Sequence, residues 1–300
     1  MALTYLNIQD IVLDLIDRSE TEDRTRIKQF INMAARDVWT SKPWRERRKT
    51  GVVETVAPYT TGTVTVTEDS GVVTGSGTTF PATNADQRKF ALSYTLPWYT
   101  VTTRDSSTQL TLGDNYAEDT ASAQTYTFFQ DVYRLASDVD TVLGIRLQRA
   151  GYGGTLGWLS ERRMDEMLTL PAFAGVPQHF CMQDLTSASL RTVKVWPVPD
   201  DTYRFQYRYL KSFTEMSADA DECVIPENRR DLIIQRAAVW AYQYVREFDR
   251  AVTQYAFYTS ELERHWKSEQ DAMPRTGRMR RFDEWGRGGG SPLTLPVADV

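Results

Sequence analysis

Cysteine and histidine are scarce in this sequence, and their scarcity limits the kinds of site that it can form. The 300 residues include two cysteines, Cys181 and Cys223, and two histidines, His179 and His265. Two cysteines give no disulfide framework, which favours folding in a reducing compartment. A structural zinc site takes four ligands, and no second pair follows near His179 and Cys181, so we expect these two side chains to be buried and satisfied within the fold. We place His265, on a helix rich in charges, at the surface or at an interface.

Long hydrophobic runs and an excess of positive charge are also absent. No apolar run approaches the roughly 20 residues that a membrane-spanning helix needs, and residues 1–10 lack the pattern of a signal peptide. The 35 Lys and Arg residues are outnumbered by 40 Asp and Glu residues, which gives a net charge of −5. Such a chain is a poor general binder of nucleic acid, because non-specific affinity depends on cations that neutralise phosphates. Because no apolar run is long enough to span a membrane, we also predict no contact with a membrane.

The motifs that usually mark an enzyme are missing as well. Gly75-Ser76-Gly77 lacks the third glycine, the Gly-Lys-Ser/Thr ending and the following helix of a nucleotide-binding loop. Asp219, Asp221 and Glu222 lack the rest of an EF-hand pattern and its glycine, so they predict a solvated loop rather than a calcium site. We expect no catalytic residue, no metal and no cofactor, and we predict that the protein is not an enzyme.

The sequence does contain enough apolar residues for a folded core, and its longest regular pattern runs from Pro226 to Met273. Hydrophobic residues make up 41% of the chain, which excludes wholesale disorder. Between Pro226 and Met273, apolar residues recur at steps of three and four, as on one face of an α-helix. The pattern predicts one long helical hairpin or a single kinked helix, which needs partners along most of its length.

Two shorter helices are predicted within residues 7–40. We place the N-cap of the first helix at Asn7, with Asp10 reaching back to it, and expect Pro43 to end the second. A basic segment that includes Trp44 follows at residues 42–49. It predicts either a contact with an acidic partner or with DNA phosphates, or a solvated turn whose Trp44 is buried in the core, and we favour the turn.

The composition changes after residue 50, where Thr, Val, Gly, Ser and Tyr become frequent and apolar residues alternate with polar ones. Turns at a spacing of about ten residues predict a small antiparallel barrel or sandwich over residues 51–133. A strand at 142–147, a short helix at 159–168 and a strand at 180–185 follow. Residues 191–210 predict a β-hairpin that turns at residues 197–201.

The last segment, residues 274–300, combines arginines and glycines with a few large apolar side chains. Such a segment cannot build its own core, so it is either disordered or an arm that becomes ordered on another subunit. We favour the arm, because purely solvated tails rarely keep side chains such as Trp285, Leu293 and Leu295.

Several segments together resemble the head-to-tail adaptor (connector or neck) proteins of tailed bacteriophages. The resemblance lies in Val193-Lys194-Val195-Trp196-Pro197-Val198-Pro199-Asp200-Asp201-Thr202-Tyr203, in Tyr207-Arg208-Tyr209-Leu210, and in Ile225-Pro226-Glu227 ahead of the long helix. The N-terminal helices, with Ile27 to Trp39 before the basic turn, are similar to the opening of that family. The Gly75-Ser76-Gly77-Thr78-Thr79-Phe80 loop with Trp98-Tyr99-Thr100-Val101 looks like a β module of phage neck and tail proteins.

The resemblance implies a structural virion protein that is assembled in the host cytoplasm. Members of the family form a closed ring, typically a dodecamer, beneath the portal, in the neck between capsid and tail. The ring would contact the portal protein and tail, nozzle or fibre proteins. Genomic DNA would pass through its channel without sequence-specific binding.

The resemblance also suggests which residues make these contacts. The C-terminal arm would dock on the portal, and the candidate portal-binding residues are Arg278, Arg280, Arg281, Phe282, Trp285, Leu293 and Leu295. Aromatic residues of the long helical segment would form the ring interface, with Tyr244, Phe248, Tyr255, Tyr258 and Trp266 as candidates.

We therefore predict an α+β fold with four parts. Residues 1–50 and 190–273 would form a helical adaptor core, with N-terminal helices, long C-terminal helices and the β-hairpin. Residues 51–135 would form the inserted antiparallel β-barrel or β-sandwich domain, residues 136–189 a mixed connecting region, and residues 274–300 the extended C-terminal arm.

Two other functions stay open at this point. Trp98, Tyr99 and Tyr116 on the β domain would stack on sugars in a carbohydrate-binding or tail-fibre-associated module. A virion-associated peptidoglycan hydrolase would need an acid and a base, for which Glu161 and Asp165 are candidates.

Overall fold

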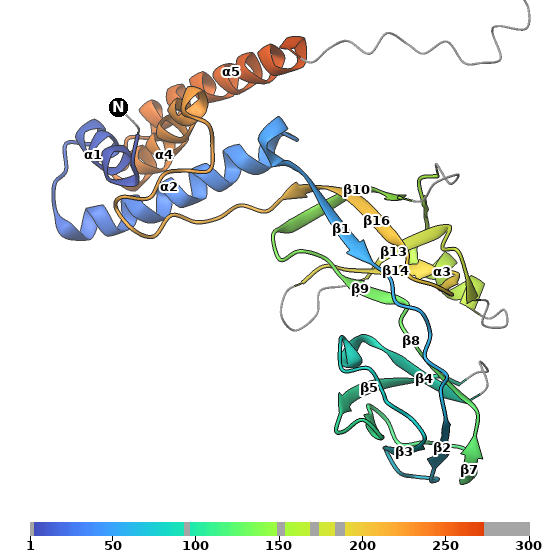
Figure 1. The fold of residues 1–300 in the computed structure, drawn as a ribbon. Helices are drawn as coiled ribbons and strands as arrows, with labels where there is room; N and C mark the ends of the chain where they lie inside the picture. The colour runs from blue at the N-terminus through green and yellow to red at the C-terminus, as the bar shows by residue number, and fades with distance from the viewer. Residues whose placement is uncertain (1–2, 93–96, 149–153, 169–173, 184–189, 273–300) are drawn as a thin grey trace, which may run out of the picture. The chain divides into compact units, whose positions relative to one another are not determined.

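The computed structural model describes residues 3–92, 97–148, 154–168, 174–183 and 190–272, which belong to two compact units. The helical unit combines Met1–Val38 with Ser217–Val300, and the β unit is Trp39–Met216. Helices and mainly antiparallel sheets occur in one chain, which confirms the predicted α+β fold (Figure 1). The four-part division of the chain stays a prediction. None of the described helices has the length and hydrophobicity that crossing a membrane requires.

Among the described residues, the helical unit contains four helices and a short turn, and the last three residues of α2 belong to the β unit. The elements are α1 (Tyr5–Leu15), α2 (Thr21–Ser41), the 3₁₀ turn η3 (Glu227–Arg229), α4 (Arg230–Tyr244) and α5 (Phe248–Ala272). The two predicted N-terminal helices are confirmed as α1 and α2, and α2 ends two residues before Pro43. Each buries part of the apolar face that its periodicity predicts, with Ile8 and Val12 on α1 and Ile27 and Ile31 on α2 fully enclosed, whereas Ile11 and Leu15 on α1 are exposed.

The predicted N-cap of α1 is wrong, because the helix begins earlier in the chain. Thr4 is the N-cap, and its side chain accepts a hydrogen bond from the backbone N–H of Asn7 at 3.4 Å. The backbone N–H groups of Tyr5 and Leu6 donate to the carbonyls of Asp221 and Asp219, at 2.9 and 3.0 Å. The donors of the first turn are thus satisfied by a loop more than two hundred positions away, which local sequence patterns do not reveal.

The two helices that follow residue 226 form a hairpin. Arg246, in the short turn between α4 and α5, has a left-handed backbone with φ of 65°. The chain then reverses, and Arg229 at the start of the hairpin pairs with Glu269 near its end, at 2.7 Å. This confirms the predicted helical hairpin and excludes the single kinked helix.

Two sheets of the β unit share one hydrophobic core. One has the strand order β1–β16–β10 and the other β11–β13–β14–β9. Phe180, Val193, Val195, Phe205 and Tyr207 from the two sheets are buried together. The elements are η1 (Arg45–Arg47), β1 (Arg48–Glu54), β9 (Val132–Arg134), β10 (Val139–Leu147), β11 (Gly157–Trp158), α3 (Glu161–Leu168), β12 (Ala174–Gly175), β13 (His179–Gln183), β14 (Thr192–Trp196), β15 (Val198–Pro199) and β16 (Arg204–Lys211). The strands and the helix predicted here are confirmed as β10, α3 and β13.

The predicted β-hairpin at residues 191–210 is wrong, although both of its strands exist. β14 pairs with β13 and β9, whereas β16 pairs with β1 and β10. Both edges of β14 and both edges of β16 are therefore occupied by other strands, which leaves no edge on which the two could pair with each other. Pro197 and Pro199 lie between them, and the intervening β15 pairs with β12 instead. Proline lacks a backbone N–H, which makes a tight hairpin ladder through this segment unfavourable.

A second hydrophobic core lies inside a seven-stranded antiparallel sheet with the order β7–β2–β3–β6–β5–β4–β8. Alternate residues such as Val64, Val66, Val101 and Leu110 point into this core, as their period of two predicts. The sheet curls around the core (Figure 1). Its elements are β2 (Thr63–Val66), β3 (Val72–Ser76), η2 (Ala85–Gln87), β4 (Lys89–Leu92), β5 (Tyr99–Arg104), β6 (Gln109–Leu112), β7 (Ala121–Gln124) and β8 (Tyr126–Phe129).

The basic segment at residues 42–49 is a turn through η1 that continues into the first two residues of β1, and its centre is buried. Trp44 is 2% exposed and Arg47 is 4% exposed. The guanidinium of Arg47 pairs with Asp140 at 2.8 Å and donates to the carbonyls of Lys42 and Lys211. Burial lowers the pKa of Arg47, while the charge of Asp140 opposes that shift. The favoured interpretation, a turn with Trp44 in the core, is confirmed.

Candidate interaction surface

The first half of α5 carries a row of exposed apolar side chains. Phe248, Val252 and Tyr255 follow one another at steps of four and three residues, so they lie on one face of the helix. Their exposed fractions are 62%, 71% and 48%, whereas Tyr258 and Leu262 on the adjacent side are buried. We call Phe248, Val252 and Tyr255 the α5 face.

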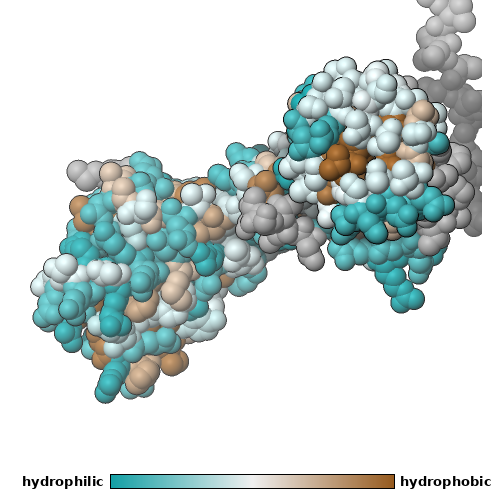
Figure 2. All heavy atoms as spheres, turned by 90° about the horizontal axis from the view of Figure 1, so that it is seen from below, coloured by the Kyte–Doolittle hydropathy of each residue, from teal (hydrophilic) through white to brown (hydrophobic). Residues whose placement is uncertain are grey.

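Contiguous apolar exposure of this kind marks a surface that binds another protein more often than single exposed residues do. Figure 2 shows another face of the molecule, on which most hydrophobic residues are scattered among hydrophilic ones and one compact hydrophobic group is bordered by residues of intermediate hydropathy. The α5 face differs because three large side chains follow one another without a charged residue between them on the same side of the helix. This arrangement makes it the strongest candidate contact surface of the helical unit.

The side chain of Arg236 on α4 orders part of the α5 face. Its guanidinium lies 4.3 Å from the ring centre of Trp240, 5.3 Å from that of Tyr255 and 5.6 Å from that of Tyr258. It also pairs with Asp37 on α2 at 2.8 Å. Because cation–π contacts and the ion pair fix the guanidinium, the ring of Tyr255 is held in place before any partner binds.

The predicted ring-interface residues divide into exposed and buried ones. Tyr244 is 37% exposed, and its hydroxyl donates to Asp23 at 3.1 Å. Phe248 and Tyr255 belong to the α5 face. Tyr258 is 5% exposed and packs inside the chain's own hairpin, where burial raises its pKa to about 12, and Trp266 is half-buried. A role of these five residues in a ring interface stays a prediction.

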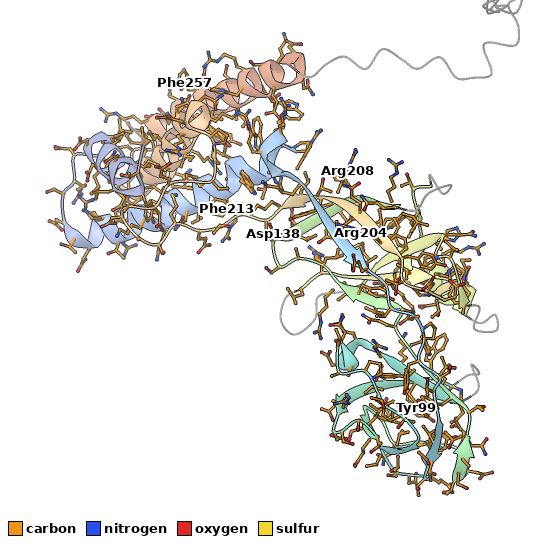
Figure 3. All side chains as sticks on the ribbon, in the orientation of Figure 1. Tyr99, Asp138, Arg204, Arg208, Phe213 and Phe257 are labelled. Atoms are coloured by element: carbon orange, nitrogen blue, oxygen red, sulfur yellow. The ribbon has the colours of Figure 1, made fainter. Side chains whose placement is uncertain are left out.

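Phe257 provides an internal comparison for the α5 face. It is 53% exposed, but it is two positions after Tyr255 and so lies roughly 200° further around the helix. Figure 3 labels this side chain on α5. Phe257 is thus an exposed aromatic residue of the same helix that does not belong to the row.

The predicted portal-binding residues lie outside the described residues. They are Arg278, Arg280, Arg281, Phe282, Trp285, Leu293 and Leu295, all within the segment 273–300. Their role as portal contacts stays a prediction.

The outward face of the β1–β16–β10 sheet forms a basic groove of about 680 Å³. Four of its lining residues are cations: Arg48 and Lys49 on β1, Arg146 on β10 and Arg208 on β16. Figure 3 shows Arg208 on β16. The lining that the structure describes includes no carboxylate, so the groove concentrates positive charge on a chain whose net charge is −5. Arg48 and Lys49, the exposed residues of the basic segment that line this groove, are therefore in a position to contact an anionic partner.

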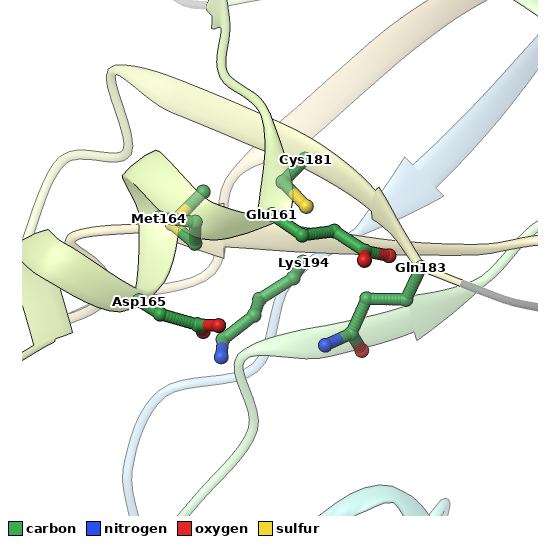
Figure 4. Close-up of a pocket in the computed structure, with 6 residues that line it drawn as sticks. All are labelled: Glu161, Met164, Asp165, Cys181, Gln183 and Lys194. Atoms are coloured by element: carbon green, nitrogen blue, oxygen red, sulfur yellow. The ribbon is translucent and has the colours of Figure 1, made fainter.

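A polar cavity of about 380 Å³ lies between α3 and the β13–β14 pair (Figure 4). Glu161 and Asp165 of α3 line it together with Lys194, a buried residue of β14. Burial lowers the pKa of Lys194, and the neighbouring ammonium of Lys89 acts in the same direction. Cys181 is also in the lining, and burial raises the pKa of its thiol, which makes it a poor nucleophile at neutral pH.

Two of the three aromatic residues proposed to stack on sugars are buried. Tyr99 and Tyr116 are 9% and 4% exposed and belong to the core of the seven-stranded sheet. Trp98 is half-buried, with its ring 5.6 Å from that of Phe129 and the ammonium of Lys89 over it. Sugar binding by Tyr99 and Tyr116 is therefore excluded as long as the domain is folded.

The acidic loop before α4 uses its carboxylates to hold the chain together. Asp219 pairs with Lys28 at 2.8 Å, Glu222 pairs with Arg230 at 3.1 Å, and Asp221 accepts backbone hydrogen bonds from Ser217 and Ala218. These partners explain the acidic cluster without calcium.

The two histidines and their neighbours differ from the expectation in detail. Cys181 is buried, as predicted, and its thiol donates to the carbonyl of Met182 at 3.3 Å. His179 is half-buried and its Nδ1 has no hydrogen-bond partner in the described part of the chain, so it is not satisfied. His265 is half-buried against α4, and together with Asp231 and Glu261 it forms a group whose spacing would suit a metal ion. Asp231 is thirty residues before Glu261, so periodicity along one helix does not reveal the group.

Comparison with known proteins agrees with a structural role. The profile of the SU10 adaptor protein family matches residues 3–281, which is nearly the whole chain. The chain belongs to the SU10 adaptor protein family. Membership indicates a structural adaptor of a phage, and hence a virion component that contacts other virion proteins. Curated proteins gave no match.

Proposed function

We propose that this adaptor forms a ring beneath the portal of a tailed phage, in the neck between head and tail. In this role it continues the DNA channel and provides the attachment site for tail, nozzle or fibre proteins. The observation that carries the proposal is the α5 face, an exposed apolar row on a chain whose family is that of an adaptor. A surface of this kind needs a protein partner, and identical copies in a ring supply one.

A closed ring with a single rotation axis has heterologous interfaces, so the surface that meets the α5 face belongs to a different part of the next copy. The outward side of α1 is a candidate, because Ile11 and Leu15 are 38% and 41% exposed and lie one helical turn apart. The proposed interface therefore joins the α5 face of one copy to α1 of its neighbour. Apolar side chains on both surfaces would leave water together when the copies meet.

The charge distribution supports a channel through which DNA passes without specific binding. The net charge of −5 disfavours tight binding to phosphates, and each additional phosphate contact would slow passage. The basic groove on the β1–β16–β10 sheet is the exception, and it would contact DNA or an acidic partner locally. The proposed C-terminal arm, residues 274–300, docks on the portal.

A pair of substitutions on α5 tests the ring. In Val252→Glu a charge is placed in the centre of the α5 face, and in Phe257→Glu the same charge is placed on another side of the same helix. We expect Val252→Glu to prevent ring formation on the portal and Phe257→Glu to assemble normally, as seen by electron microscopy and native mass spectrometry. Both positions are exposed, so each variant should keep its helical circular dichroism. Normal rings from Val252→Glu would refute the proposed interface.

Peptidoglycan hydrolysis is a second candidate, because Glu161 and Asp165 line one cavity. Their arrangement does not favour it, since the two residues stand one turn apart on the same helix rather than on opposite sides of a substrate groove. Loss of zymogram activity in Glu161→Gln, but not in Glu166→Gln on the same helix, would support hydrolysis. We expect no activity in the unmodified chain.

A further inference from the structure

Three metal-ligating side chains converge between α4 and α5. Asp231 lies at the start of α4, and Glu261 and His265 lie four residues apart on α5. One ligand atom from each of the three residues lies within 4.8 Å of the others. The spacing of four residues places Glu261 and His265 on the same side of α5, and the hairpin brings Asp231 to that side.

The separation of His265 and Asp231 suits a shared ion better than a direct hydrogen bond. Nε2 of His265 is 3.5 Å from Oδ2 of Asp231. Two ligands of a tetrahedral zinc ion, each about 2.1 Å from the metal, stand roughly 3.4 Å apart. An N–H···O hydrogen bond is shorter, usually about 2.9 Å.

Buried atoms without partners point to the same place. Nε2 of His265 and Oδ1 of Asp231 are buried and have no hydrogen-bond partner among the described residues. Buried polar atoms are normally paired, so two such atoms in one small group indicate a ligand that completes the set. Asp231 is nevertheless 46% exposed along its side chain, which leaves an entrance for an ion and its water.

The donor set indicates the class of ion. Two carboxylates and one neutral imidazole carry a charge of about −2, which balances a divalent cation, and nitrogen with oxygen donors suits a first-row transition metal. Calcium and magnesium prefer oxygen donors alone. Arg264, which is 68% exposed, pairs with Oε2 of Glu261. A carboxylate has two oxygens, so the other oxygen of Glu261 is left to bind the ion.

We propose that Asp231, Glu261 and His265 bind a divalent transition-metal ion, with Zn²⁺ as the reference ion and water at the remaining position. The ion would tie α5 to α4 and so stabilise the hairpin that carries the α5 face. The proposal does not depend on ring formation, because all three ligands belong to one chain.

The histidine count allows a direct test on the untagged, metal-free full-length protein. Because the chain has two histidines, ring-¹⁵N labelling of histidine gives two imidazoles to follow by NMR during a Zn²⁺ titration. We expect one Zn²⁺ per chain, with the signals of one imidazole shifting. The shift and the binding should disappear in His265→Gln and persist in the matched variant His179→Gln.

A second variant keeps the test independent of the histidine. Asp231→Asn preserves the shape of the side chain and should weaken Zn²⁺ binding at least tenfold by calorimetry, with unchanged helical circular dichroism. Zinc binding of wild-type strength in both His265→Gln and Asp231→Asn would overturn the proposal. The same conclusion would follow if the protein bound no Zn²⁺, or if binding disappeared only when the cysteines were blocked.

Discussion

Arg47 shows what a single buried charge does in this protein. Its guanidinium is almost fully enclosed, yet it has an acceptor in each direction: the carboxylate of Asp140 and the carbonyls of Thr40, Lys42 and Lys211. The planar group of arginine presents several N–H donors at fixed angles, which lets one side chain join the end of α2, the turn that follows it and the end of β16. Lysine could not satisfy this many acceptors.

Replacing Arg47 with methionine should therefore destabilise the β unit. We expect a loss of about 2–4 kcal/mol in the free energy of unfolding, because Asp140 loses its charged partner and the carbonyls of Thr40, Lys42 and Lys211 each lose one hydrogen bond. Urea unfolding followed by tryptophan fluorescence measures this loss. The matched variant Arg48→Met changes an exposed neighbour and should stay within about 0.5 kcal/mol of the unmodified protein. Equal effects in the two variants would contradict the role of Arg47.

The carboxylate of Asp221 predicts a dependence of stability on pH. Backbone hydrogen bonds from Ser217 and Ala218 hold the pKa of Asp221 below its usual value. A depressed carboxylate pKa in the folded state stabilises the fold above the unfolded pKa of about 3.9, and this contribution is lost as the pH falls through the folded pKa. Asp221→Asn should lower the melting temperature at pH 7, and its difference from the unmodified protein should shrink below about pH 4.

Asp114→Asn provides the control for this titration. Asp114 is an exposed carboxylate in a turn of the β unit, so its replacement should change the melting temperature little at any pH. A difference between Asp221→Asn and the unmodified protein that stayed constant from pH 7 to pH 3 would contradict the assignment.

At the scale of elements, the α4–α5 hairpin depends on one buried ion pair at its open end. The side chains of Arg229 and Glu269 are 10% and 5% exposed and lie 2.7 Å apart. Glu269→Gln should destabilise the helical unit by about 2–4 kcal/mol, because the buried guanidinium of Arg229 loses its counter-charge. Glu247→Gln removes an exposed pair with Arg250 and should cost less than about 0.5 kcal/mol. Thermal unfolding followed at 222 nm compares them, and similar losses would contradict the prediction.

Local patterns predicted most of the helices and strands, but they did not predict the strand partners. The period of two in β14 and β16 is present in the sequence, and both strands form. Their pairing with one another failed because β14 finds β13 and β9, and β16 finds β1 and β10. The same limit explains the N-cap of α1, since the carbonyls of Asp219 and Asp221 reach it from a distant loop. Partner choice is a property of the whole fold, and proximity along the chain is a weak guide to it.

The candidate surface was predictable to a similar extent. Helical periodicity places Phe248, Val252 and Tyr255 in one row, and they are exposed together. It cannot separate them from Tyr258, whose burial depends on Arg236 and on the packing of α4. Of the group of Asp231, Glu261 and His265, the spacing of four residues between Glu261 and His265 is present in the sequence, but Asp231 joins them only when the hairpin closes.

At the scale of the whole molecule, residues 274–300 should be dispensable for folding and necessary for docking. A chain that ends at residue 273 keeps every described helix and strand. We expect its thermal unfolding to match that of the full chain, and its binding to isolated portal rings to be lost in a pull-down assay. Full binding by the shortened chain would refute the arm. If binding is lost, a chain with Arg278, Arg280 and Arg281 replaced by Ala tests whether the charges or the apolar side chains of the arm dominate its binding to the portal.

The helical unit is discontinuous: it opens with Met1–Val38 and is completed after Ser217. On the ribosome, α1 and α2 emerge before the β unit, but the carbonyls that close the first turn of α1 and the helices that cover its apolar side arrive only after the entire β unit has been made. At ~5–20 residues per second this delay is on the order of ten to forty seconds. During that interval the β unit can fold, while the two newly made helices expose Ile8, Val12, Ile27 and Ile31 to solvent. A truncated product that ended near residue 216 would leave the apolar faces of α1 and α2 exposed, so premature termination should yield insoluble or chaperone-bound fragments.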